Sequence, residues 1–240
     1  MIKHSATLFQ VIALSAGALG FASGAYASLI DQGATVYDTD LSVAWLKDAN
    51  LAATQTFGVA GINAVGNMSW DTAHTWVAAM NAANYLGYND WRLPLIVDTG
   101  TPGCNYSYNA TDCGYNVDTA TSEMAHLFYD ELHNISPFFT NGSPNPAWVL
   151  LGANTSPFVN MIQLTDGYWS STESAVDPSR AWRVNFGDGY QTTFRKDDPD
   201  IHVIVLRDVA AIPEPSALSL LGFGLQGAGA LRRRKSTNHS

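Results

Sequence analysis

The sequence has few cysteines and few charged residues, and each shortage excludes a class of protein. Two cysteines in 240 residues are too few for a disulfide-dense scaffold or for a zinc site built from four thiolates. Charged residues make up 14% of the chain and hydrophobic residues 46%, a balance that excludes a disordered protein. The length suits one medium-sized domain with extensions, or two small domains. An ordinary hydrophobic core must therefore supply most of the stability.

Basic residues are scarce in the middle of the chain. Five of the 12 Lys and Arg residues lie at the ends, as Lys3 and the run 232–235. Residues 28–211 therefore contain seven basic and twenty acidic residues, a net charge of −13. A domain this acidic repels phosphate backbones, so the composition excludes nucleic acid as a partner.

The N-terminus has the composition of a targeting segment. It combines a basic start, an apolar stretch from Ala6 to Ala22 and small residues just before Ser28. This pattern predicts a secretory signal peptide over residues 1–27 that is cleaved after Ala27. The alternative is a buried N-terminal helix, which three glycines within the segment would weaken.

The C-terminal segment, residues 212–235, forms a second signal. Pro213, Glu214 and Pro215 are followed by sixteen uncharged residues and then by four basic ones. A helix of that length reaches about 24 Å, short of the roughly 30 Å hydrocarbon core, so the predicted transmembrane span is weak. The basic run favours the cytoplasmic side, which places the preceding chain outside the inner membrane. The segment resembles the PEP-CTERM sorting signal of Gram-negative bacteria, which implies processing by an exosortase. A permanent single-pass anchor is the alternative.

Residues 28–211 contain no internal repeat or low-complexity linker, and we interpret them as one domain. A helix is expected to start at Ser69 and to have Gly87 as its C-cap, and a second helix is expected over residues 122–133. The predicted strands cover residues 36–38, 43–46, 168–172, 181–186, 191–195 and 202–209, with a hairpin around Asp40 and a tight turn at 187–189. This order predicts an α+β domain in which two helices pack against a small antiparallel sheet, with long loops between them.

Several of these segments resemble the Lcl C-terminal domain family. The resemblance rests on residues 43–50, the helix that contains Trp70, the Asp-Trp-Arg-Leu-Pro segment at 90–94, and residues 168–172 and 205–207, with an insertion near 99–121. The family is named after the end domain of a bacterial collagen-like adhesin and is usually grouped with C-type-lectin-like folds. The resemblance therefore implies a lectin-like fold and a binding or surface role such as adhesion. The chain has no collagen-like repeat.

A polar loop between the two cysteines is a candidate recognition surface. Cys104 and Cys113 enclose eight residues, and in an oxidising compartment a pair at this spacing is expected to close as a disulfide. A metal or redox pair is disfavoured, because the sequence has no Cys-x-x-Cys spacing and no further thiols. Tyrosines in a stapled loop offer contact area at a small entropic cost. A solvated insertion with no partner is the alternative.

The aromatic side chains are the expected contact groups for a sugar, because sugar C–H faces pack on aromatic rings. The tryptophans at core positions of predicted elements are expected to be buried: Trp45, Trp70, Trp91, Trp169 and Trp182. The remaining candidates for ligand binding are Tyr106, Tyr108, Tyr115, Trp148 and Tyr190.

Two sets of polar side chains are possible metal ligands. His126, Asp130 and His133 share one face of the second predicted helix, opposite its apolar stripe, and we expect this face to be solvated rather than to hold a metal. Acidic residues in turns near the last strands are weak calcium candidates, because calcium prefers carboxylate and carbonyl oxygens on flexible loops. Their spacing matches no calcium-loop motif, and acidic surface turns are the alternative. The calcium candidates are Asp197, Asp198 and Asp200.

The sequence contains no motif for nucleophilic, zinc-peptidase or phosphate chemistry. The lectin-like fold class includes formylglycine-generating enzymes, which by resemblance use cysteines near the C-terminal end, and no cysteine follows Cys113 here. We therefore expect a non-catalytic domain that binds extracellular polysaccharide or another surface component. The chain is expected to cross the inner membrane, to be held there by its C-terminal span until exosortase processing, and to end at the cell surface or in the matrix. The alternatives are a structural matrix protein without a small ligand and, less favoured, an enzyme of the formylglycine-generating fold class.

Overall fold

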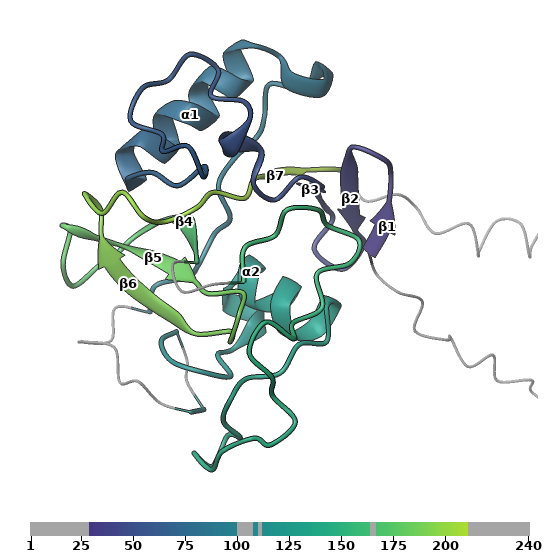
Figure 1. Cartoon of the computed structure of the whole chain (residues 1–240), viewed down its shortest axis with the longest axis vertical. Coiled ribbons are helices and arrows are strands. Elements are labelled where there is room, and N and C mark those ends of the chain that lie inside the picture. The colour runs from purple at the N-terminus through teal and green to yellow at the C-terminus, as the bar shows by residue number, and fades with distance from the viewer. Residues whose placement is uncertain (1–28, 100–107, 110–111, 164–166, 211–240) are drawn as a thin grey trace, which may run out of the picture.

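The computed structural model describes residues 29–99, 108–109, 112–163 and 167–210, and these residues form helices and two antiparallel sheets (Figure 1). The strands are β1 (Leu29–Asp31), β2 (Thr35–Asp38), β3 (Val43–Leu46), β4 (Tyr168–Glu173), β5 (Arg180–Val184), β6 (Gln191–Arg195) and β7 (Leu206–Asp208). The α-helices are α1 (Trp70–Ala82) and α2 (Glu123–Ala125), and α2 continues directly into a π-helix, η4 (His126–Glu131). Short 3₁₀ helices are η1 (Leu51–Ala53), η2 (Tyr85–Gly87) and η3 (Thr119–Thr121). The α+β prediction is confirmed.

The prediction of one small sheet is wrong, because the strands form two sheets. One has the order β1-β2-β3-β7 and the other the order β4-β5-β6. The predicted last strand covers residues 202–209, but the strand within it is only β7, where Leu206 pairs with Trp45 of β3, and His202 forms an isolated bridge to Tyr168 of β4. The apolar residues before β7, from Ile201 to Val205, are all buried. They run through the interior between the two sheets, and a buried connection of this kind has the apolar pattern of a strand.

The hairpin around Asp40 is confirmed. In the β2–β3 pair Val36 lies opposite Trp45, and the Asp38 carboxylate holds the turn by accepting hydrogen bonds from the backbone N–H groups of Asp40 (3.1 Å) and Leu41 (2.9 Å). Strand β1, which pairs with β2, was not predicted. It has only three residues, too few for an alternating pattern to show.

Helix α1 begins where the sequence predicts. Ser69 caps it, with its side-chain oxygen accepting from the backbone N–H of Thr72, and Asp71 lies in the first turn. The predicted C-cap at Gly87 is wrong, because the helix ends at Ala82. Asn84 adopts a left-handed conformation (φ 49°) that stops the helix, and Gly87 instead closes η2.

The second helix, predicted over residues 122–133, starts near its expected position with Ser122 as its N-cap, but only its first three residues are α-helical. In η4 the turn widens, and the Leu132 N–H donates to the carbonyl of Leu127, five residues earlier, at 3.0 Å. The predicted apolar stripe is buried as expected; it comprises Met124, Leu127, Phe128 and Leu132.

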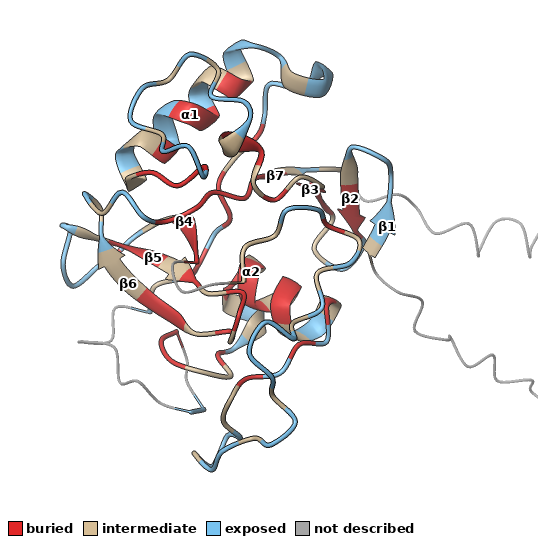
Figure 2. Cartoon of the chain, viewed as in Figure 1, coloured by how far each residue is buried: buried red, intermediate tan, exposed pale blue. Residues whose placement is uncertain are grey.

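The buried residues of these elements are red in Figure 2, and most of the hydrophobic ones form two large cores. The first, here called the α1 core, packs α1 and β4 around Trp76, Met80 and Trp169. The second, the η4 core, packs η4, β2, β3 and β5 around Trp45 and Phe128. In Figure 1, α1 lies at the upper end of the molecule, and the long loop that follows η4 lies at the lower end. Of the five tryptophans predicted to be buried, four are at most 4% exposed, and only Trp70 is partly exposed.

Candidate functional site

Three of the five predicted ligand-binding residues lie together. Tyr108 and Tyr115 pack on Phe138, and Tyr190 packs on Tyr115; we call these four residues the aromatic cluster. The Tyr115 ring centroid lies 4.8 Å from that of Tyr190 and 5.2 Å from that of Phe138, and the Tyr108 centroid lies 4.8 Å from that of Phe138. Tyr108 is 38% exposed, and Tyr115 and Tyr190 are partly exposed. The cluster therefore presents ring surface to solvent.

Polar contacts hold the aromatic cluster in place. The side-chain amide of Asn116 donates to the carbonyls of Tyr108 (2.8 Å) and Phe138 (3.1 Å), which ties two segments together. The Asp188 carboxyl lies beside the Tyr115 hydroxyl. Burial raises the pKa of Asp188 above its ordinary value, and burial, with the nearby Asp188 charge, also raises the pKa of Tyr115. The phenol therefore stays a hydrogen-bond donor at neutral pH.

A cleft of about 460 Å³ lies on the loop that follows η4, and Trp148 lines it. The Trp148 indole N–H donates to the Gly187 carbonyl at 3.2 Å, so the cleft reaches the β5–β6 turn that leads to Tyr190. Asn134 and Asn154 brace its wall, since the Asn134 amide bonds to both the N–H and the carbonyl of Asn154. The lining residues are His133, Asn134, Ile135, Ala147, Trp148, Val149, Gly152, Ala153, Asn154 and Gly187.

The β5–β6 turn connects the cleft with the aromatic cluster. Gly187 contacts Trp148 on one side, and Tyr190 contacts Tyr115 on the other. Between them Gly189 has a positive φ of 74° and packs so closely on Phe128 and Tyr129 that a Cβ atom would clash with both rings. The turn thus rests directly on the helical segment, which fixes the position of both features.

The remaining predicted residues fall in different places. Tyr106, Cys104 and the processing residues Ala27, Ser28, Pro213, Glu214 and Pro215 lie outside the described residues, as does the C-terminal span. Cys113 is buried and is not a free thiol, but its bond to Cys104 stays a prediction. Within the described part of the chain, no helix has the length and apolar character required to cross a membrane.

The three calcium candidates lie in the turn that follows β6. The Asp197 carboxylate pairs with Arg195 at 3.2 Å and is 77% exposed, and the Asp198 carboxylate accepts from the backbone N–H of Asp200 at 3.0 Å. These contacts are those of an acidic surface turn. Calcium binding there stays a prediction.

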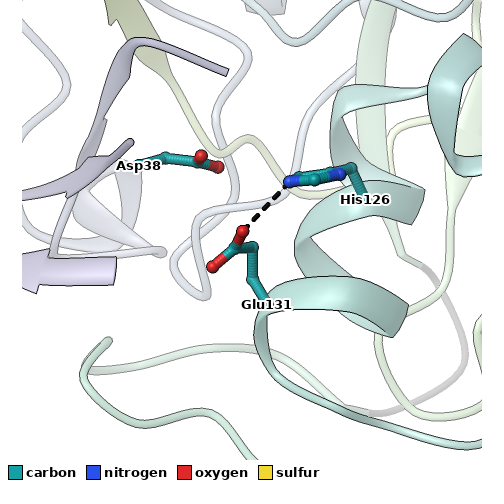
Figure 3. Close-up of side chains that lie close together, drawn as sticks. All are labelled: Asp38, His126 and Glu131. Carbon is teal, nitrogen blue, oxygen red and sulfur yellow. Dashed lines mark hydrogen bonds and ion pairs between the residues drawn. The ribbon is translucent and has the colours of Figure 1, made fainter. Parts of the chain in front are cut away.

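A second group of polar side chains is buried between β2 and η4. Figure 3 shows Asp38 facing His126 and Glu131 across the space between the two elements. Potential ligand atoms of all three residues lie within 4.8 Å of one another. Asp38 is fully buried, and the side chains of His126 and Glu131 are 12% and 2% exposed. We call these residues the buried triad.

Hydrogen bonds orient each member of the buried triad. The imidazole of His126 lies between two carboxylates, with Nε2 3.0 Å from Glu131 Oε1 and Nδ1 3.1 Å from Asp130 Oδ2. The second oxygen of Asp38 accepts from the Trp45 indole N–H at 3.3 Å. The hydrogen bond to Glu131 raises the pKa of His126, and burial raises the pKa of Asp38.

The expectation of a solvated face formed by His126, Asp130 and His133 is therefore wrong in part. Asp130 and His133 are exposed, but His126 is directed inward to the triad. His133 leaves the helix in a left-handed conformation (φ 53°) and lines the cleft instead. Sequence reasoning also missed Asp38 and Glu131. Strand alternation, which places Asp38 on the same face as the core residue Val36, could have indicated the first of them.

No curated protein and no solved structure matches the chain. Residues 211–235 match the PEP-CTERM protein-sorting motif, which supports an exported, exosortase-sorted protein of the Gram-negative cell surface or exterior. Residues 34–207 match the Lcl C-terminal domain, and this match covers most of the sequence. The chain therefore belongs to the Lcl C-terminal domain family and carries a PEP-CTERM sorting signal.

Proposed function

We propose that this exported protein is a non-catalytic lectin-like binder of extracellular polysaccharide, and that the aromatic cluster and the adjoining cleft hold the sugar. One observation carries the proposal. Partly exposed aromatic rings from distant parts of the chain converge beside an open cleft that is lined by a further tryptophan. A sorting signal that delivers the domain to the cell exterior makes surface and matrix polysaccharides its available partners.

The chemistry of this surface suits a sugar. Aromatic faces pack against sugar C–H groups, while phenol and carboxyl groups bond hydroxyls. Tyr115 and Asp188 supply both kinds of group at one place. The cleft volume of about 460 Å³ falls within the range of small-ligand sites. It can hold a short stretch of a longer glycan.

The charge of the domain narrows the class of glycan. Residues 28–211 carry a net charge of −13, and Asp188 lies directly beside the aromatic cluster. Like charges repel at close range, so sulfated or uronic-acid-rich polymers are disfavoured. Neutral or amino-sugar-containing polysaccharides are the favoured ligands.

A glycan screen with the purified chain, carried out with and without calcium, tests the proposal. Trp148→Ala and Tyr108→Ala are each expected to lower the affinity for the selected glycan at least about fivefold, which corresponds to about 1 kcal/mol, a loss that only a minority of contact residues exceed. Tyr88→Ala is the matched control. It removes a ring of similar exposure, 40% against 38% for Tyr108, from the other end of the molecule, where that ring stacks on Arg207.

Two outcomes would overturn this proposal. One is a folded chain that binds no glycan under either condition, which would favour a structural matrix protein without a small ligand. The other is a glycan that binds the Trp148 and Tyr108 variants as tightly as the wild type. A ligand lost only on calcium removal would place the ion in the binding mechanism and would direct attention to Asp197, Asp198 and Asp200.

Exosortase processing is tested separately. Replacing Pro213, Glu214 and Pro215 with alanine is expected to leave a longer chain retained in the membrane, because the recognised motif is lost. An unchanged processed size and location would refute cleavage at this signal.

A further inference from the structure

The buried triad joins two segments that are 88 residues apart in the sequence. Asp38 ends β2, while His126 and Glu131 are the first and last residues of η4. In an α-helix two residues five positions apart point about 140° away from each other. The π-helix has a wider turn, and it brings His126 Nε2 and Glu131 Oε1 to 3.0 Å. Single π turns inside helices occur frequently at functional sites.

We propose that Asp38, His126 and Glu131 form a binding site for a divalent transition-metal ion, with Zn²⁺ as the best fit. This proposal is independent of the sugar site. One imidazole nitrogen and two carboxylate oxygens form a ligand set that zinc uses, whereas calcium and magnesium prefer oxygen alone.

The spacing of the ligand atoms suits a small ion. Zinc bonds to nitrogen and carboxylate oxygen measure about 2.0–2.2 Å, so tetrahedral ligand atoms lie about 3.3 Å apart. The Nε2–Oε1 distance of 3.0 Å is close to this value, and all three ligands lie within 4.8 Å of one another. A small side-chain adjustment would complete a three-ligand site, with water in the fourth position.

Charge balance also supports a cation at this place. Asp38 and Glu131 bring two carboxylates into a site where their side chains are at most 2% exposed. Two ionised carboxylates beside a neutral imidazole would carry a charge of −2, and buried net charge is costly. A divalent ion with a neutral imidazole brings the triad to zero.

Asp130 provides the outer support that metal-bound histidines need. Its carboxylate lies 3.1 Å from His126 Nδ1, the ring nitrogen directed away from Glu131. A carboxylate at this position fixes the tautomer in which Nδ1 carries the proton and Nε2 is free to bind metal. The ion would then fasten the β2–β3 hairpin to η4.

Zinc titration of the purified, chelator-treated chain, followed by calorimetry and thermal melting, tests the site. We expect one zinc ion per chain, an affinity for zinc at least about 100-fold above that for calcium, and a melting temperature that rises with zinc concentration. His126→Gln is expected to abolish the zinc-dependent rise, and Asp130→Asn to weaken binding about tenfold.

The matched control is His74→Gln, which removes an exposed histidine of α1 and should leave zinc binding unchanged. Circular dichroism checks that each variant is folded, and Asp130→Asn keeps all three ligands should His126→Gln fail to fold. The proposal is overturned if the wild type binds zinc no more tightly than His126→Gln, or if His74→Gln and Asp130→Asn are weakened alike. The triad would then be a hydrogen-bonded imidazolium clamp.

Discussion

The two cores satisfy their buried polar groups in different ways. In the α1 core the tryptophan indoles donate to backbone carbonyls, Trp76 to Gln55 at 2.8 Å and Trp169 to Met68 at 2.9 Å. In the η4 core the Trp45 indole instead donates to the buried carboxylate of Asp38. Neutral pairs cost little to bury, whereas buried ionisable groups are expensive.

This difference assigns different roles to the two halves of the domain. The α1 core contains neutral, satisfied hydrogen bonds of the kind that hold a scaffold together. The η4 core includes the buried triad, and the cleft and the aromatic cluster lie around its helical segment. Ionisable groups with perturbed pKa values concentrate at functional sites. The contrast predicts large stability effects in the α1 core and effects on binding around η4.

Trp169→Ala should give the largest loss of stability. The side chain is fully buried, and its removal leaves a cavity and an unpaired Met68 carbonyl, so we expect a loss of about 3–5 kcal/mol in the free energy of unfolding. Trp148→Ala is the comparison, with an expected loss of no more than about 1 kcal/mol because that ring is partly exposed at the cleft. Urea denaturation measures both. Equal losses would contradict the assignment of scaffold and site.

Arg92→Ala should have the next largest effect, because Arg92 joins the two halves. Its guanidinium forms two hydrogen bonds to Glu123 of α2, at 2.7 and 2.8 Å, and pairs with Asp208 of β7 at 2.6 Å. Removal leaves the Glu123 carboxylate, which is 17% exposed, without a counter-charge, although it still accepts from the Leu95 N–H at 2.7 Å. The arginine itself is 32% exposed, so we expect a loss of about 2 kcal/mol, below the value for a fully buried pair.

Arg195→Ala provides the control for that experiment. Its pair with Asp197 is 66% and 77% exposed, and such pairs contribute less than about 0.5 kcal/mol. Chemical denaturation of both variants would show whether the burial of an ion pair determines how much it contributes to the free energy of unfolding. A loss for Arg195→Ala as large as that for Arg92→Ala would contradict this view.

Much of the scaffold follows from the sequence because its signals are local. Ser69 before an amphipathic run defines the start of α1, and β-branched and aromatic residues after the turn at 187–189 indicate β6. The sheet partners of β7 could not be predicted in this way. Leu206 pairs with Trp45 across more than 150 residues of sequence, and pairing at that range depends on packing of the whole domain.

The sites were predicted unevenly for a related reason. Three of the predicted tyrosines do lie together, since polar loops rich in aromatic residues commonly form surfaces. The buried triad was missed because helical periodicity assumes an α-helix, and the π turn that pairs His126 with Glu131 changes which residues share a face. No local residue pattern signals a π turn.

The two helix caps allow a smaller test of the same comparison. Ser69→Ala removes a partly exposed cap from α1, and Ser122→Ala removes a buried cap from α2. Each should cost about 1 kcal/mol. We expect the larger loss at Ser122, which is 2% exposed, because the Ala125 N–H would be left without its partner away from water. Thermal melts of the two variants show which substitution lowers the stability more. A larger loss for Ser69→Ala than for Ser122→Ala would contradict the prediction.

The smallest expected effect concerns pH. Burial raises the pKa of Asp188 in the folded chain above its unfolded value, so this group stabilises the fold below about pH 4 and loses that contribution as the pH rises through the folded value. Asp188→Asn removes this dependence and keeps an oxygen that can accept from the Tyr190 N–H. Urea denaturation at pH 4 and pH 7 gives the change in the free energy of unfolding between these pH values. This change should be less unfavourable for Asp188→Asn than for the wild type. Asp197→Asn, in an exposed turn, should retain the wild-type difference between the two pH values. If Asp188→Asn and Asp197→Asn showed the same pH dependence of stability, the burial of Asp188 beside the aromatic cluster would not explain the effect.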